Sequence, residues 1–268
     1  MRTVAKTGLV ADIRADTAPA EAPRRIIALR ADMDGLRMQE QNLNLPYRSQ
    51  IDGCAHMCGH DGHMAGLVLA AALVRAKRHQ IPDDCAVRLL FQPAEEGGRI
   101  EPGAKQGGAL PMIHAGVIEG VEEVYGLHNL PTAPLGEVRV AAGPVMARST
   151  ELEITVRGKG GHASQPHNSV DPVVAGAAIV ASLQTVVSRA LPPAAAAVVS
   201  VTNFKAGSGA LNVIPDDATL SGTIRTFEDE VFAKVEEVVP RIVDSVAAAH
   251  GATASLRIET KFPSVVNP

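Results

Sequence analysis

Tryptophan is absent from the sequence, and phenylalanine, tyrosine and tryptophan together make up only 3% of its 268 residues. An aromatic platform that stacks nucleic-acid bases or sugars is therefore not expected. Basic residues are in the minority, since 25 Lys and Arg stand against 29 Asp and Glu for a formal net charge of −4. Nucleic acids and anionic membranes attract basic surfaces, so we expect neither as a partner.

Cysteines are few, and long apolar runs are missing. The three thiols, at Cys54, Cys58 and Cys85, cannot form a disulfide framework, and their odd number is typical of a reducing compartment. No segment approaches about eighteen uninterrupted apolar residues, and the N-terminal stretch lacks the apolar core of a signal peptide. We therefore predict a globular, cytoplasmic protein.

The first half of the chain alternates strand-like and helix-like stretches. The expected strands are 25–30, 86–91 and 121–127, and the expected helices are 60–77 and 107–117. Such alternation favours a layered α/β domain with a largely parallel sheet, which we place at 1–147.

The second half of the chain has a different order of predicted strands and helices. The expected strands are 152–156, 196–204, 219–227 and 254–260, and the expected helices are 172–189 and 228–250. Asp171 supplies an acidic cap and Pro172 a proline at the first helical position. The order β-α-β-β-α-β is the ferredoxin-like α+β pattern, so we predict a second domain at 148–262 and a linker at 263–268.

The densest group of metal-ligating side chains is the run Cys54-Ala-His-Met-Cys58-Gly-His60-Asp61-Gly-His63. Thiols, imidazoles and a carboxylate within ten residues are typical of a metal site. The alternative is a chance run of polar residues at a helix N-terminus.

Candidate ligands also follow every predicted strand of the first domain. The first strand is followed by Asp32 and Asp34, the second by Glu95 and Glu96, and the third by His128. Ligands in parallel α/β sheets gather at the carboxyl ends of strands, so we expect these groups to converge with the cysteine–histidine run. Each residue alone has an ordinary explanation as a turn, cap or surface residue, but their joint placement favours a metal site.

The adjacent carboxylates Glu95 and Glu96 have a catalytic use, because one can bind a metal while the other takes a proton from water. Thiolate and imidazole ligands favour Zn²⁺, whereas carboxylates also accept Mn²⁺ or Co²⁺. The residues predict a metal-dependent hydrolase and leave the identity of the metal open.

A glycine-rich run, Gly158-Lys-Gly160-Gly-His162-Ala163, imitates a dinucleotide-binding fingerprint. Pro166 and the polar turn after it keep a helix from starting at the glycines, so a pyrophosphate would lack its helix N-terminus. We reject that interpretation and expect the loop to present His162.

Six ordered motifs together resemble the M20 family of metallopeptidases and amidohydrolases. They are ALRADMDGL, CAHMCGHDGH, QPAEEGG, YGLHN, GKGGHASQP and NVIPDDATLSGTIRTF. The resemblance covers nearly the whole chain and is strongest to the subgroup that hydrolyses N-acyl, indole-acetyl or benzoyl amino acid conjugates. It implies a zinc-peptidase-like α/β catalytic domain with an inserted ferredoxin-like domain that acts as a lid or dimerisation domain.

The resemblance also implies a set of site residues. Its ligands for two divalent metal ions per subunit, Zn or Mn, would be Cys58, His60, Glu96 and His128. Glu95 would be the general base, and Asp34 would orient a ligand.

The ferredoxin-like domain would supply the remaining site residues and a homodimer interface. His162 would stabilise the oxyanion, and Asn212 and Arg225 would hold the substrate carboxylate, which suits the two-pronged donors of arginine. The ordinary alternatives are a loop histidine for His162 and an exposed strand charge for Arg225.

The chain departs from the family pattern at both ends. The pattern continues past the lid into a segment with one more histidine ligand, whereas this sequence stops at Pro268, and the N-terminal helical region is largely missing before Met1. An additional stretch at 99–103 separates Glu96 from His128. We interpret the chain as a truncated member with an incomplete catalytic domain.

The expected function is hydrolysis of the amide bond in a small N-acyl or aryl-acyl amino acid, which gives a carboxylic acid and a free amino acid. Two alternatives stay open. One is a catalytically impaired homologue that acts as a dimerising or binding protein, and the other is a peptidase of short peptides.

Overall fold

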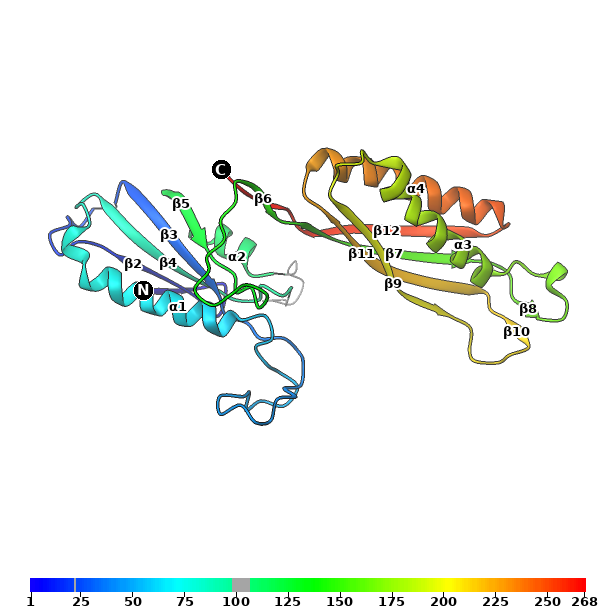
Figure 1. Ribbon diagram of the computed structural model, residues 1–268, viewed down its shortest axis with the longest axis horizontal. Helices are drawn as coiled ribbons and strands as arrows, with labels where there is room; N and C mark the ends of the chain where they lie inside the picture. The colour runs from blue at the N-terminus through cyan, green and yellow to red at the C-terminus, as the bar shows by residue number, and fades with distance from the viewer. Residues whose placement is uncertain (22, 98–106) are drawn as a thin grey trace. The chain divides into compact units, whose positions relative to one another are not determined.

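A computed structural model describes residues 1–21, 23–97 and 107–268 of the chain (Figure 1). It divides into two compact units, Met1–Glu137 and Val138–Pro268. The additional stretch at 99–103 lies outside the described residues.

A five-stranded sheet with the order β1-β2-β4-β3-β5 forms the frame of the first unit. Its strands are β1 (Arg2–Val4), β2 (Gly8–Ile13), β3 (Arg25–Asp32), β4 (Cys85–Gln92) and β5 (Val121–Gly126). β3 runs parallel to both of its neighbours, β4 and β5, whereas β2 runs antiparallel to β4. The parallel centre confirms the predicted α/β class and brings the carboxyl ends of three strands to one edge of the sheet.

The antiparallel β1–β2 hairpin is missing from the sequence-based prediction. Its turn passes through Ala5 and Lys6 at φ 46° and 65°, left-handed values that glycine and asparagine adopt more readily. Neither of those residue types occurs in the turn, so the usual hairpin signal is not present.

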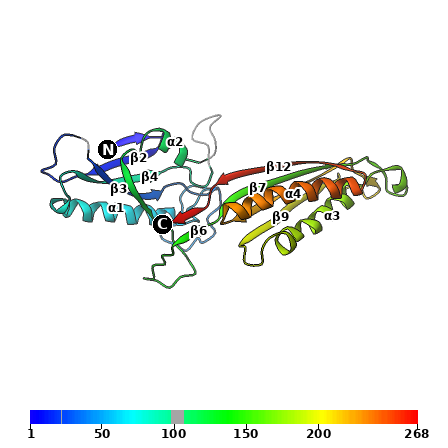
Figure 2. The same cartoon turned by 90° about the horizontal axis from the view of Figure 1, so that it is seen from above.

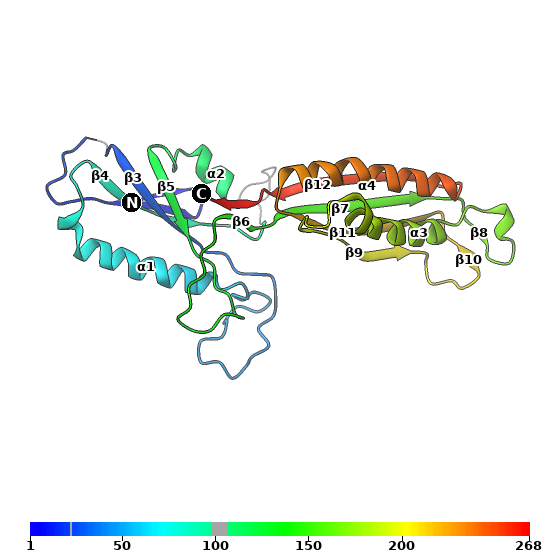
Figure 3. The same ribbon diagram turned by 45° about the horizontal axis from the view of Figure 1, so that its top comes forward.

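Two helices, α1 (His60–Ala76) and α2 (Ala109–His114), cover opposite faces of this sheet (Figure 3), and a short 3-10 turn, η1 (Arg78–Gln80), follows α1. Leu67 of α1 packs with Leu89 of β4, whereas Met112 of α2 packs with Leu90 of the same strand. Successive residues of a strand point to opposite faces, which explains this arrangement. α2 ends earlier than predicted, because Gly116 takes a left-handed φ of 76°.

The second unit contains an antiparallel sheet with the order β12-β7-β11-β9. Its strands are β7 (Arg148–Arg157), β9 (Ala197–Ala206), β11 (Asp217–Thr226) and β12 (Thr253–Phe262). Two helices, α3 (Pro172–Thr185) and α4 (Asp229–Ala249), cover one face of this sheet (Figure 2). The order of these elements along the chain is the predicted β-α-β-β-α-β.

Shorter elements complete the second unit. They are the pair β8 (Gly161–His162) and β10 (Val213–Ile214), the pair β6 (Gly143–Met146) and β13 (Val265–Asn267), and the turns η2 (Pro166–Asn168) and η3 (Val186–Ala190). β13 pairs with β6 near the two ends of the unit.

The core of the second unit lies between its sheet and its two helices. Ile154 of β7, Ile179 of α3 and Val239 of α4 are all buried members of this core. Apolar and polar residues alternate along β7, so every second side chain reaches the helix-covered face. The predicted cap of α3 is also present, since Asp171 Oδ1 accepts a hydrogen bond from the Val173 N–H at 2.8 Å.

One segment, Pro172–Ala190, is long and apolar enough to span a membrane by length and composition alone. Its inward residues Ala175, Leu183 and Val186 are fully buried in the core of the second unit. Packing against the sheet therefore explains the apolar residues on this face, and 28% of the apolar window is buried in the structure.

Candidate metal centre

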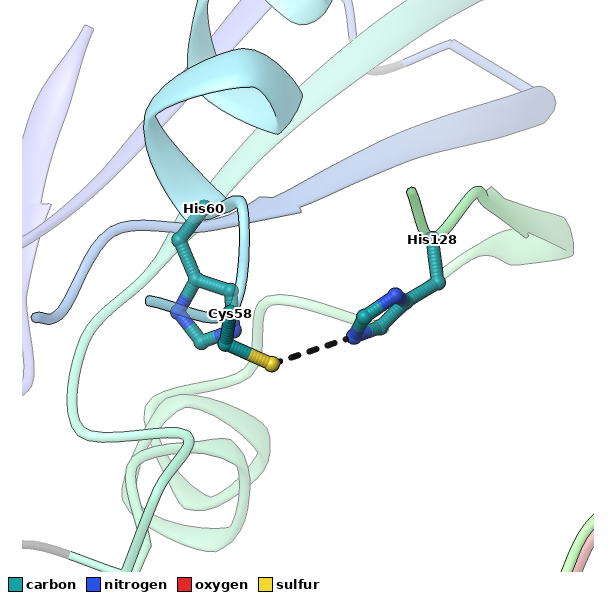
Figure 4. Close-up of side chains that lie close together, drawn as sticks. All are labelled: Cys58, His60 and His128. Carbon is teal, nitrogen blue, oxygen red and sulfur yellow. Dashed lines mark hydrogen bonds between the residues drawn. The ribbon is translucent and has the colours of Figure 1, made fainter. Parts of the chain in front are cut away.

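The cysteine–histidine run turns sharply at a glycine before α1 begins. Gly59 takes a left-handed φ of 84°, which is costly for residues with a Cβ atom, and α1 starts at the next residue, His60. The turn lets Cys58 and His60 lie on the same side of the chain, close to His128 from the loop after β5 (Figure 4).

Three groups of candidate ligands share His60, and two of them contain the residues expected as ligands. In the first group, the ligand atoms of Cys58, His60 and His128 all lie within 4.8 Å of one another, and in the second group those of His60, Glu95 and Glu96 do so. The Cys58 sulfur is 3.3 Å from Nε2 of His128. Nε2 of His60 is 3.8 Å from a carboxylate oxygen of each glutamate. The structure thus brings together all four residues expected as ligands, with Glu95 beside them.

Backbone carbonyls determine which nitrogen of each histidine is free. Nδ1 of His60 is 2.9 Å from the carbonyl oxygen of Asp34, and a carbonyl only accepts, so Nδ1 carries the proton. Nδ1 of His128 lies 2.7 Å from the carbonyl oxygen of Asn129, with the same consequence. Both histidines therefore direct the lone pair of Nε2 into the site, as a metal ligand requires.

Nε2 of His60 is a buried acceptor that lacks a hydrogen-bond partner among the described residues. The side chain is 1% exposed, and leaving such an atom unsatisfied costs about 1–3 kcal/mol. A cation held between this nitrogen and the neighbouring carboxylates would offset that cost, so the donor set fits a divalent metal.

Asp34 supports both sides of the site. Its carbonyl oxygen accepts from His60, and its carboxylate oxygen Oδ2 accepts from the backbone N–H of Glu96 at 3.0 Å. The carboxylate therefore lies where it can hold the β4 loop that carries the glutamates.

Burial and negative charge perturb the acidic groups of the site. Burial, followed by a hydrogen bond and charge from Glu96 and the charge of Glu95, raises the pKa of the Cys58 thiol to about 11. Burial and the charge of Glu96 also raise the pKa of Glu95. A cation in the site would counteract both effects, because it favours the ionised forms.

An open cleft of about 970 Å³ borders this site, and its lining includes Asp34 and Glu96 together with the cations Lys6 and Arg37. Small-molecule sites occupy clefts of this size, roughly 300–1,000 Å³. Asp34 and Glu96 thus face open space on this side of the site.

His63 and Asn129 have roles in the site that the sequence did not predict. Nδ1 of His63 is 2.6 Å from the carboxylate of Asp32, and both side chains are buried. The Asn129 backbone N–H donates to Nε2 of His63 at 2.8 Å. Both residues stand inside quoted motifs, but spacing alone does not indicate which histidine binds another residue instead of a metal.

The second unit contains the candidate for oxyanion stabilisation, His162, and the two substrate-binding candidates, Asn212 and Arg225. His162 and Asn212 are neighbours. His162 pairs with Val213 between β8 and β10, and the carbonyl of Asn212 accepts from the Ala163 N–H at 3.0 Å. Arg225 stands near the far end of β11, which begins at Asp217. At about 3.3 Å per residue, it lies about 26 Å along the strand from that beginning, so the structure does not group it with the other two.

The sequence matches the model of peptidase family M20/M25/M40 over residues 28–261. An N-acetylcysteine deacetylase of Bacillus subtilis is 42% identical over 262 residues, which cover 98% of this chain and 64% of that protein. An N-acyl-L-amino acid amidohydrolase of Geobacillus stearothermophilus is 39% identical over 247 residues, or 92% of this chain and 64% of the relative.

A solved structure shares both fold and sequence with the chain. The YXEP protein of Bacillus subtilis, described as a dinuclear metal-binding peptidase from the M20 family, superposes with a TM-score of 0.76 at 38% identity, covering 98% of this chain and 63% of that one. The chain thus spans a little under two thirds of the length of these relatives. The family match and these identities confirm the resemblance predicted from the motifs, and the chain belongs to peptidase family M20/M25/M40.

Proposed function

We propose that the chain carries the metal centre of a hydrolase that cleaves the amide bond of small N-acyl or aryl-acyl amino acids. The observation that carries the proposal is the buried, unpartnered Nε2 of His60, which lies between two groups of metal-ligating side chains. The names of the relatives support the substrate class, because two of them act on N-acetylcysteine and N-acyl-L-amino acids.

Two divalent ions per chain, Zn or Mn, would be held by Cys58, His60, Glu96 and His128. When bound, such ions polarise an amide carbonyl and acidify water. The dinuclear site of the related solved structure supports the number. The thiol and two imidazoles favour Zn²⁺, whereas the carboxylate also accepts Mn²⁺.

Glu95 would act as the general base that takes a proton from the attacking water and delivers it to the leaving amine. Its raised pKa supports this role, because a base whose pKa is closer to the working pH also returns the proton readily.

Replacing Glu95 with glutamine tests this role directly. Since general acid–base catalysis contributes roughly 10²–10⁴-fold, we expect Glu95→Gln to lower kcat by at least about 100-fold while metal content, measured by elemental analysis, stays at the wild-type level. Near-normal turnover by the variant would exclude the role.

The region 148–262 would serve as a lid and dimerisation domain attached to a catalytic domain at 1–147, with 263–268 leading onward from it. His162 would stabilise the oxyanion, and Asn212 and Arg225 would hold the substrate carboxylate.

Arg225 stands about 26 Å along β11 from the end near Asn212, a span longer than an N-acyl amino acid. This separation favours a homodimer in which two copies contribute to one site, and sedimentation velocity of the whole chain tests it.

The proposed compartment is the cytoplasm, because an odd number of cysteines, three in all, is typical of a reducing compartment. The deciding experiment for the function is metal stoichiometry after dialysis, followed by hydrolysis assays with N-acyl amino acids and with dipeptides. Two ions per chain and preferred cleavage of N-acyl amino acids are expected. Preferred cleavage of dipeptides would indicate a peptidase, and bound metal without hydrolysis would indicate a binding protein.

A further inference from the structure

We propose that Asn129 and His63 are positioning residues that hold His128 against the Cys58–His60 turn. The inference rests on the proposed metal centre, since it concerns how one ligand of that centre is fixed. Neither residue belongs to the proposed ligand set.

The hydrogen bonds of His63 exclude it as a metal ligand. The backbone N–H of Asn129 lies 2.8 Å from Nε2 of His63, and because an N–H only donates, Nε2 is the acceptor. Nδ1 therefore carries the proton and donates to Asp32 Oδ1 at 2.6 Å. With both nitrogens engaged, His63 has no lone pair for a cation, although its ligand atom lies within 4.8 Å of those of Asp32 and His60.

Asp32 fixes His63 from the end of β3. The Asp32 side chain is buried, and its Oδ1 accepts the hydrogen bond from Nδ1 of His63. Arg30 Nη1 donates to the second carboxylate oxygen at 2.8 Å. His63 is thus held in one orientation by a buried charged partner.

Asn129 makes three hydrogen bonds that all bear on the ligands. Its N–H donates to His63, its carbonyl accepts from Nδ1 of His128 at 2.7 Å, and its side-chain Nδ2 donates to the carbonyl of Gly59 at 3.0 Å. The hydrogen bond to the Asn129 carbonyl sets the tautomer of His128. The hydrogen bond from the Asn129 side-chain amide connects the same loop to the glycine between Cys58 and His60.

Two glycines make room for the Asn129 amide. A Cβ atom on Gly59 would lie 2.5 Å from Nδ2 of Asn129, and one on Gly62 would lie 2.8 Å from it. One helical turn further along α1, a Cβ atom on Gly66 would meet nothing within 4 Å. Gly62 and Gly66 are both exposed helical positions, so they differ in this contact and form a matched pair.

The first test separates the two hydrogen bonds of His63. A glutamine places its oxygen near the position of Nε2 and keeps the acceptor for Asn129, whereas an asparagine reaches the position of Nδ1 and keeps the donor to Asp32. Cobalt titration of the metal-free chain should give His63→Asn an affinity roughly 10- to 100-fold weaker than wild type, and His63→Gln an affinity clearly higher than that of His63→Asn. The reverse order would overturn the proposal, because it would show that His63 acts only by satisfying Asp32.

The second test uses the glycine pair and does not disturb any buried polar group. Both Gly62→Ala and Gly66→Ala raise helix propensity, but only Gly62→Ala displaces the Asn129 amide from Gly59. We expect weaker cobalt binding, by about tenfold, for Gly62→Ala alone. Equal affinities for the two variants would overturn the role of the Asn129 side chain.

A metal-free measurement separates this proposal from the proposed function. Hydrogen exchange of the Asn129 amide should be slow in the wild type and in His63→Gln, and fast in His63→Asn. A wild-type chain that binds no cobalt would contradict the proposed function. Slow exchange of its Asn129 amide would still support the link proposed here, which is the hydrogen bond from Asn129 to His63. Exchange at the solvent rate in the wild type would overturn the link whether or not the chain binds cobalt.

Discussion

At the scale of single residues, Cys58 shows how the surroundings of a ligand control its binding. Burial and the charges of Glu96 and Glu95 raise its pKa to about 11, so the sulfur is a protonated thiol at neutral pH. A metal binds the thiolate, and binding must therefore expel the proton.

We expect metal binding at pH 7 to release at least one proton from Cys58 for the ion that this sulfur ligates. Because the pKa lies above the working pH, affinity should rise about tenfold per pH unit toward that pKa. Calorimetry of zinc binding in two buffers of different ionisation enthalpy measures the release. In Cys58→Ser the release should fall by about one proton, and an unchanged value would contradict the assignment.

The sequence was sufficient to predict that the residues at the strand ends of the first domain would meet, but not how each would be used. Strand ends in a parallel sheet share one edge, so the placement of Glu95, Glu96 and His128 was informative. The difference between His60 and His63 depends on a carbonyl facing one ring and an N–H facing the other. Such backbone contacts come from tertiary structure and leave no pattern in the spacing of residues.

At the scale of elements, local signals located helices better than edge strands. Asp171 and Pro172 marked the start of α3 because a cap acts through neighbouring residues. The β1–β2 hairpin was missed because its turn uses Ala5 and Lys6 at left-handed φ values. A pairing between strands stabilises that turn, and a single stretch of sequence does not reveal the pairing.

Gly222 of β11 provides a test at this scale. The pairing of β11 with β9 shifts register between Ser221 and Gly222, and a Cβ atom on Gly222 would lie 1.9 Å from the carbonyl oxygen of Ser200. Backbone cannot move aside as a flexible side chain does, so Gly222→Ala should lower the free energy of unfolding by roughly 1–3 kcal/mol. Urea denaturation measures it, with Ser221→Ala as the neighbouring control, and equal stabilities of the two variants would contradict the expected clash.

At the scale of the whole molecule, each apolar core lies within one of the two units. Among the described residues, each cluster of buried side chains draws its members from Met1–Glu137 or from Val138–Pro268 alone. The change in the order of predicted strands and helices indicated two domains, but the unit boundary depends on packing, which composition does not record.

Separate cores predict separate unfolding transitions, with metal acting on one of them. All proposed ligands belong to the first unit, so a divalent ion at 100 times its Kd should stabilise that unit by about 2.7 kcal/mol and leave the second unchanged. Scanning calorimetry with and without zinc measures both transitions. A single transition that moves as a whole would show that the units unfold together.

The raised pKa of Cys58 also bears on the chemical reactivity of this sulfur before a metal binds. Alkylating agents and peroxides attack the thiolate rather than the thiol, and the carboxylates beside Cys58 keep it in the thiol form. The same negative charges that attract a cation therefore favour the thiol, which is the less reactive form of its sulfur ligand, before the cation binds.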